Sequence, residues 1–148
     1  DGQSSSNTFL DVEYKGVDLR GNRYEVRSKE AQFDINNPEI IKMKVMSAIF
    51  YFKDGTILKV RGNYGIYNNK NNDMSFRENV SAEYQQNYLF SDNLDFFNTK
   101  NSLTIYGNVR TESIKGSMTA DNLKFDLLEQ TLDVSMLNDK QIDMKLKN

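Results

Sequence analysis

Histidine and cysteine are both absent from the chain. Their absence excludes disulfides, thiolate nucleophiles, the Ser-His-Asp and Cys-His catalytic arrangements, and nearly every zinc-binding set. Most familiar enzyme chemistries lose their reactive groups in this way. We therefore expect no enzymatic activity, no catalytic residues, no metal site and no cofactor.

An excess of positive charge is missing as well. The chain carries 19 Lys and Arg residues against 21 Asp and Glu residues, which gives a net charge of −2. A nucleic-acid-binding protein normally shows a basic stripe, so we do not expect nucleic acid as a partner. The length of 148 residues fits one domain and is too short for two independent ones.

Long hydrophobic runs are also missing. No stretch approaches the roughly 20 apolar residues of a membrane-spanning helix, and residues 1–8 (DGQSSSNT) are polar. The chain begins with Asp instead of Met, so we expect that a membrane anchor or a signal preceded it and that residues 1–8 form a flexible linker. The domain itself is expected over residues 9–148.

The chain does contain many short stretches in which apolar and polar residues alternate, as half-buried antiparallel strands require. Proline occurs once, at Pro38. Asp54-Gly55 is the clearest hairpin signal, and the apolar run Met46 to Phe52 is interpreted as a strand. Further turn signals lie at residues 15–16, 20–22, 36–38, 68–73, 98–101 and 138–139.

An internal repeat adds to this pattern. Residues 28–34, 62–68, 91–97 and 120–126 share a small or polar residue, two spacers, a small or apolar residue, and then an aromatic residue. The aromatic residues are Phe33, Tyr67, Phe96 and Phe125, spaced by 34, 29 and 29 positions. A strand-turn-strand unit of this size cannot bury its apolar face alone, so copies must stack. The repeat fits a sandwich, a jelly roll or a solenoid, or it fills the core of a closed β-domain.

Several segments together resemble a known family. They are residues 9–12, 15–31, 52–55, 60–67, 78–80, 88–94, 107–110 and 115–121. In order and spacing they resemble the soluble domain of the LptC family of lipopolysaccharide-export proteins, over roughly residues 9 to 136. This family shares its repeat with LptA and other OstA-like proteins, and the glycine-containing turn at residues 15–22 favours LptC.

The resemblance implies an all-β fold, a twisted open β-jelly roll of two antiparallel sheets that is V-shaped in section and has an apolar groove. It implies a periplasmic protein, tethered to the inner membrane, that serves outer-membrane biogenesis. Such a protein passes lipopolysaccharide from the inner-membrane exporter complex to the LptA-like bridge protein. ATP hydrolysis would belong to the exporter, and no phosphate-binding loop follows Gly62 or Gly65.

A groove for lipid A acyl chains must be apolar along its length. Each methylene taken from water is worth ~0.8 kcal/mol, so exposing a chain of a dozen carbons would cost on the order of 10 kcal/mol. The alternation predicts that the groove is lined by Phe33, Met43, Val45, Leu58, Val60, Tyr67, Met74, Phe76, Tyr88, Phe90, Phe96, Leu103, Ile105, Val109, Phe125, Leu132 and Val134.

The end of the chain predicts a contact with the next protein in the series. The stretch Gln141 to Lys147 alternates cleanly and is interpreted as an exposed docking strand, because an unpaired edge recruits another strand. Alternatively, it is a polar tail with three chance apolar residues. The predicted interface residues are Leu10, Val12, Tyr14, Ile142, Met144 and Leu146.

Three other interpretations remain open. The chain could be an LptA-like bridge protein, which would carry a cleaved signal peptide in place of a membrane helix. It could also be a structural β-repeat or assembly module with a closed interior. An enzyme would have to work with acidic pairs such as Asp92 with Asp95, or Glu112 with Asp121, and solvated surface acids explain these pairs more simply.

Overall fold

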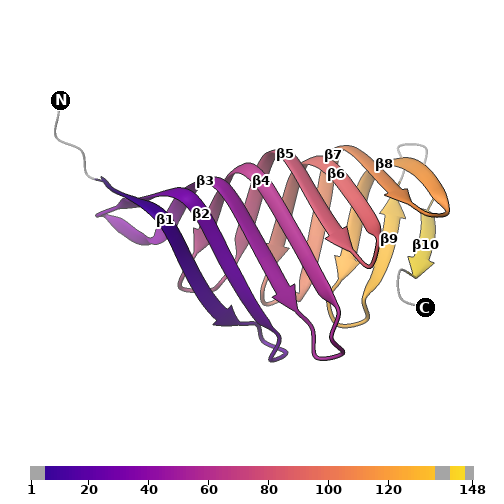
Figure 1. Cartoon of the computed structure of the whole chain (residues 1–148), viewed down its shortest axis with the longest axis horizontal. Helices are drawn as coiled ribbons and strands as arrows, with labels where there is room; N and C mark the ends of the chain where they lie inside the picture. Colours follow the sequence, from indigo (N-terminus) through magenta and orange to yellow (C-terminus); the bar gives the residue numbers. More distant parts are fainter. Residues whose placement is uncertain (1–5, 136–140, 146–148) are drawn as a thin grey trace.

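Ten antiparallel strands form one continuous sheet in the computed structural model, which describes residues 6–135 and 141–145. Each strand pairs with the next one in sequence, so β1 and β10 are the two edges (Figure 1). This confirms the all-β prediction. The strands are β1 (Ser6–Val17), β2 (Arg23–Asp34), β3 (Asn37–Tyr51), β4 (Ile57–Asn68), β5 (Met74–Tyr84), β6 (Asn87–Phe97), β7 (Ser102–Ser113), β8 (Gly116–Asp126), β9 (Thr131–Ser135) and β10 (Gln141–Lys145).

Most turns lie where the sequence predicts them, but the turn predicted at residues 15–16 is wrong, because these residues belong to β1 and the turn follows at residues 18–22. Asp54-Gly55 connects β3 to β4, with Gly55 at φ 90° and its amide donating to the Phe52 carbonyl over 3.0 Å. Met46 to Tyr51 belongs to β3, as predicted. Among the described residues no helix has the length and apolarity needed to cross a membrane.

A row of irregular positions crosses the sheet near the middle of strands β1 to β8. At these positions the pairing ladder is interrupted and several residues take a left-handed conformation, including Asn79 at φ 55° and Asn108 at φ 49°. We call these positions the bend row: Asp11, Lys29, Val45, Asn63, Asn79, Asp92, Asn108 and Asp121. β-Bulges of this kind bend a strand and increase its twist.

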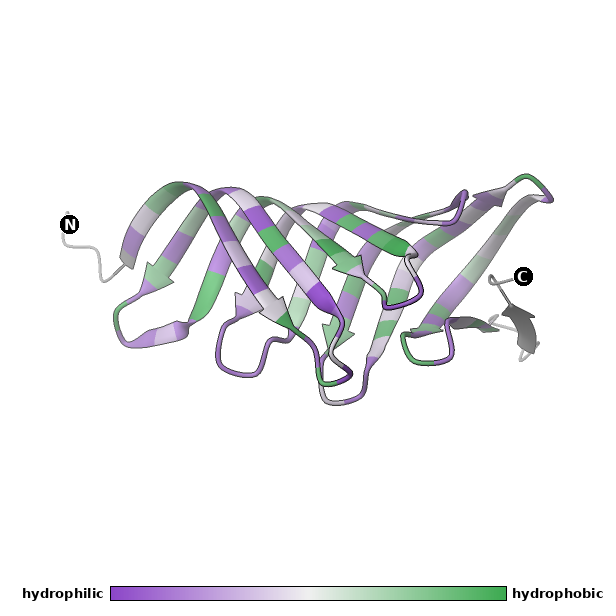
Figure 2. Ribbon diagram, turned by 60° about the horizontal axis from the view of Figure 1, so that its bottom comes forward, coloured by the Kyte–Doolittle hydropathy of each residue, from purple (hydrophilic) through white to green (hydrophobic). Residues whose placement is uncertain are grey.

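The bend row divides the sheet into two leaves that face each other across the core. Hydrophobic and hydrophilic residues alternate along the strands of both leaves (Figure 2). Leaf A comprises residues 12–17, 23–28, 46–51, 57–62, 80–84, 87–91, 109–113 and 116–120. Leaf B comprises residues 6–10, 30–34, 37–44, 64–68, 74–77, 93–97, 102–106 and 122–126, together with β9 and β10.

The bend explains the repeat found in the sequence. In each even-numbered strand from β2 to β8 the inward residues are spaced by three positions and then two, as in Gly62, Gly65 and Tyr67. A regular strand would space them by two throughout, and the extra residue at the bend turns the side chains over. Small residues occupy the start of each repeat, namely Ser28, Gly62, Ser91 and Ala120.

Close packing across the bend explains why the fourth position of the repeat in β4, Gly65, must be small. A Cβ added at Gly65 would collide with the sulfur of Met46 and with the Ser75 carbonyl oxygen. Met46 is fully buried against this glycine. The glycine at position 65 therefore allows β3 and β5 to approach from both sides.

Three aromatic pairs join the leaves across the core. Each pair takes its leaf-B ring from one of the repeated aromatic positions. The pairs are Tyr24 with Tyr67, whose hydroxyls lie 3.1 Å apart, Phe50 with Phe96, whose ring centroids lie 5.1 Å apart, and Tyr84 with Phe125, whose centroids lie 5.3 Å apart. Burial raises the pKa of Tyr24, and so does its hydrogen bond to Tyr67, so the Tyr24 phenol remains protonated. The repeat thus supplies one cross-leaf contact for every two strands.

Val45 is strained, because a β-branched residue at φ 53° is an outlier. Asn79 and Asn108 hold the corresponding bend positions in β5 and β7. We predict that Val45→Asn raises the free energy of unfolding by about 1 kcal/mol, measured by urea denaturation. Val45→Thr keeps the branch at Cβ and serves as the control. An equal gain in stability in both variants would mean that polarity, and not relief of backbone strain, causes the effect.

Candidate functional site

Most of the predicted groove residues lie on the inner face of the leaves. The buried ones pack against each other and fill the space between leaf A and leaf B. They are Met43, Leu58, Val60, Tyr67, Met74, Phe76, Phe96, Leu103, Ile105, Val109, Phe125, Leu132 and Val134. Phe33 is also inward but only partly buried, and its ring packs edge-on against Phe9 at 5.3 Å. The middle of the predicted groove is therefore packed protein.

Two of the predicted groove residues do not face the interior, and a third lies at its rim. Val45 is 36% exposed at the bend. Phe90 lies on the outer face, where the Arg110 guanidinium sits 4.6 Å above its ring. Tyr88 is 40% exposed but borders a pocket between the leaves. The prediction that Val45 and Phe90 line the interior is wrong for a common reason. The prediction continued one alternating pattern of apolar residues through the bend row, where the inward and outward faces of each strand change places.

In this part of β6, the residues that alternate with Tyr88 and Phe90 are the buried ones. Leu89 and Ser91 are buried, whereas Tyr88 and Phe90 are not. Leu89 was missed by the sequence analysis. The repeat contains the signal that identifies it, because Leu89 precedes the small residue Ser91 by two positions and therefore lies on the same face of leaf A.

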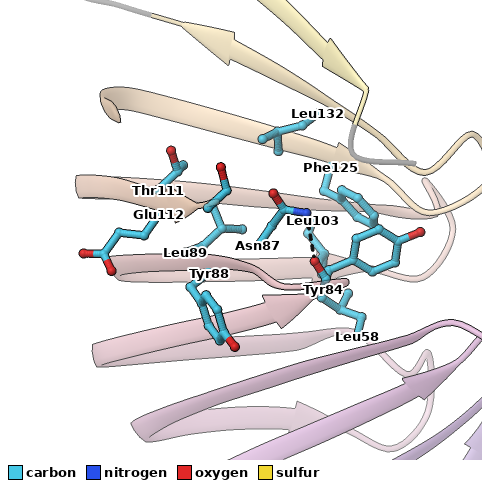
Figure 3. A pocket seen from close by; sticks show the side chains of 11 residues that line it. Leu58, Tyr84, Asn87, Tyr88, Leu89, Leu103, Thr111, Glu112, Phe125 and Leu132 are labelled. Carbon is cyan, nitrogen blue, oxygen red and sulfur yellow. Dashed lines mark hydrogen bonds between the residues drawn. The ribbon is translucent and has the colours of Figure 1, made fainter. Parts of the chain in front are cut away.

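A pocket opens between the leaves near the β10 end of the sheet (Figure 3). Leaf A contributes residues from β4 to β7, and leaf B contributes residues from β7 to β9. The lining residues are Leu58, Tyr84, Asn87, Tyr88, Leu89, Leu103, Thr111, Glu112, Ser113, Phe125 and Leu132. The space that admits a water molecule measures about 30 Å³, so the pocket is a narrow slot.

The slot lies where the series of aromatic pairs ends. Tyr84 and Phe125 form the pair nearest to β10. Beyond it, leaf A presents Leu89, Thr111 and Ser113 to the slot, and leaf B presents Leu132. None of these four side chains is aromatic, and Tyr88 is the aromatic residue that borders the slot on this side. In Figure 3, Tyr84 and Phe125 lie at one end of the slot, and Thr111 and Glu112 lie at the other.

A polar cluster joins the two leaves behind Tyr84. The Gln130 side chain, from the turn between β8 and β9, accepts hydrogen bonds from the hydroxyls of Tyr84 and Thr56, the latter over 3.2 Å. Its amide nitrogen donates to a carboxylate oxygen of Asp54 over 3.1 Å. Gln130 is 7% exposed and has φ 54°. Burial raises the pKa of Tyr84, so its phenol remains a donor.

The predicted interface residues lie at both edges of the sheet. Leu10 is 73% exposed and faces outward, because the bend at Asp11 separates its face from that of Val12 and Tyr14. The predicted single alternating face for these three residues is therefore wrong. Both Val12 and Tyr14 pack against the core.

At the other edge, Ile142 and Met144 of β10 pair in register with Val134 and Leu132 of β9. Leu146 lies outside the described residues.

Three acidic residues from the pairs considered in the sequence, Asp92, Asp95 and Glu112, bind other side chains. Asp95 binds the Arg77 guanidinium at 2.7 Å and accepts a hydrogen bond from the Tyr106 hydroxyl. Asp92 accepts a hydrogen bond from the Asn108 side chain. Glu112 binds Arg110 at 3.0 Å. Within the described part of the chain, no group of three or more acidic residues is arranged to hold a metal ion.

No protein-family model and no curated protein matches this chain. The functional proposal below therefore depends on the slot, the sheet edges and the resemblance of the sequence.

The polar cluster predicts a measurable contribution to stability. Replacing Gln130 by Met keeps the size of the side chain and leaves the Tyr84 hydroxyl without its acceptor. We expect a loss of about 1–3 kcal/mol in the free energy of unfolding, measured by urea denaturation. Gln86→Met is the matched control, because Gln86 also has a left-handed backbone but is exposed. Equal effects in the two variants would contradict a role for the cross-leaf hydrogen bonds.

Proposed function

We propose that this chain is a periplasmic lipopolysaccharide-binding and transfer protein of the LptC type. In this proposal it receives lipid from the inner-membrane exporter complex and delivers it to an LptA-like bridge protein. A membrane anchor ahead of residue 1 would tether it to the inner membrane. The observation that carries the proposal is the apolar slot between the leaves, at the end of an open sheet.

The chemistry of the slot suits a hydrocarbon chain. Leu89, Leu103 and Leu132 offer it no hydrogen-bond donors or acceptors from their side chains. A peptide in the slot would leave its backbone polar groups unpaired, which costs several kcal/mol. A saturated acyl chain is linear and has no such groups, so it matches a narrow apolar slot.

An acyl chain needs more room than the slot now offers, so the leaves must separate at their rims. The backbone hydrogen bonds run between neighbouring strands within the sheet. Away from the bend row, where the strands themselves join the leaves, side-chain contacts hold leaf A to leaf B. The rims can therefore move apart without loss of the ladder. Separation of the rims loses the cross-leaf packing near Tyr84 and Phe125. Burial of the acyl chain offsets this loss by ~0.8 kcal/mol for each methylene.

The edges of the sheet suit the transfer between successive proteins. β1 and β10 each pair on one side only within the described residues. Strand addition at such an edge would join a second sheet to this one. Because Leu132 of β9 lines the slot and β9 pairs with β10, a partner joined at β10 would continue the apolar path. We therefore propose β10 as the docking edge for the LptA-like bridge protein.

A closed structural module is the rival function, and the packed middle of the domain favours it. Phe50, Phe76 and Phe96 are fully buried there and leave no path along the whole sheet. The two functions differ in whether lipid enters at all. Extraction of the purified protein followed by mass spectrometry separates them, because a structural module would contain no stoichiometric lipid.

Photo-crosslinking tests the binding of lipid in the slot. We predict that benzoylphenylalanine at Leu89 becomes crosslinked to lipopolysaccharide, because this residue lines the slot. The same group at Phe90 should give at least tenfold less product, because Phe90 lies on the outer face. Circular dichroism shows whether both variants are folded, and equal labelling of the two positions would contradict the slot.

Truncation tests the docking edge. We predict that deletion of residues 141–148 abolishes co-purification with an LptA-like partner, because it removes β10 and with it the proposed edge. The variant should remain folded and still bind lipid, since the slot is lined by residues from Leu58 to Leu132. Calorimetric titration with the partner, run beside a thermal melt, measures both properties. Undiminished binding by the truncated chain would place the interface elsewhere.

A further inference from the structure

The Tyr84 side chain lies at the inner end of the slot, beside Phe125 (Figure 3). The Tyr84 ring packs against Phe125 at 5.3 Å and against Phe52 at 6.1 Å. Its hydroxyl donates to Gln130, which is itself fixed to Asp54 at 3.1 Å. Tyr84 is 2% exposed. Ring contacts from both leaves and a hydrogen bond at its tip therefore hold Tyr84 in one orientation.

Leu58 and Leu103 flank Tyr84 at the inner end of the slot. Leu58 is the register partner of Tyr84 in β4, and Leu103 is the partner of Phe125 in β7. Both line the slot. One strand further from β10, the Phe50 and Phe96 rings close the interior at a centroid distance of 5.1 Å. Tyr84 is therefore the largest leaf-A side chain between the slot and this next apolar layer.

We infer that Tyr84 is the depth stop of the slot and determines the length of the saturated acyl chain that the domain accepts. This inference rests on the proposed lipid-binding function and adds its selectivity. The chain enters between Leu89 and Leu132, and its methyl end meets the Tyr84 ring. The polar head of the lipid remains outside, near Thr111 and Ser113.

A stop of this kind predicts how affinity depends on chain length. Each methylene that enters the slot adds about 0.8 kcal/mol, a factor of about four in affinity. The increase ends when the methyl group reaches Tyr84, because a longer chain leaves its additional methylenes in water. A slot without a stop would show an increase that continues through the series.

The test uses the whole chain and a series of free fatty acids as probes: octanoate, decanoate, laurate, myristate and palmitate. Titration calorimetry below the micelle concentration gives the affinity for each. In the unchanged protein the affinity should level off within the series. In Tyr84→Leu the levelling should move to longer chains, with a gain of about fourfold for each methylene admitted.

Two further variants make the result specific to Tyr84. Phe96→Leu removes a buried aromatic ring that does not line the slot, so its levelling length should equal that of the unchanged protein. Gln130→Met leaves the Tyr84 ring in place and removes its acceptor, so chains longer than the levelling length should gain affinity. If Tyr84→Leu fails to fold, Gln130→Met carries the test.

The outcomes separate the depth stop from the proposed function. Unchanged levelling in both Tyr84→Leu and Gln130→Met, with fatty acids still bound, overturns the stop and leaves lipid binding intact. An equal shift in Phe96→Leu also overturns it, because the interior has then only loosened. Absence of binding in every form of the protein overturns the proposed function and the stop together.

Discussion

The fold depends on one constraint, which is that strands β1 to β8 each belong to two facing leaves and must turn their side chains over at the bend. If a regular strand continued through the bend, the apolar side chains of one of its halves would point toward water. The extra residues in the bend row prevent this. Because they recur in eight successive strands, one sheet encloses a core without pairing its first strand with its last.

The position of the slot follows from the same arrangement. Leaf-B aromatic residues pair with leaf-A rings two or three strands nearer the N-terminus, as Phe125 of β8 does with Tyr84 of β5. The series of pairs must therefore run out before the sheet does. Beyond the last pair, no further ring-to-ring contact between the leaves is found among the described residues, and the apolar interior becomes accessible beside β9.

The repeat and the turn residues were enough to predict the strands and most of the inward residues. Spacing between Phe33, Tyr67, Phe96 and Phe125 identifies the hairpins, because each of them precedes a turn. The alternation failed at Phe90, since a bend that inserts one residue is invisible to a pattern of period two. Gln130 could not be found either, because its partners Asp54 and Thr56 are more than 70 positions away in sequence.

In the proposed function an acyl chain enters at one end of the domain and stops there, while the middle stays packed. Methyl NMR spectra recorded with increasing laurate follow both regions at once. We expect shifts at Leu89, Leu103 and Leu132, which line the slot, and unchanged signals at Ile41 and Val26 in the packed interior. Shifts along the whole interior would contradict the packed middle by revealing a continuous groove, and a spectrum that laurate leaves unchanged would contradict lipid binding itself.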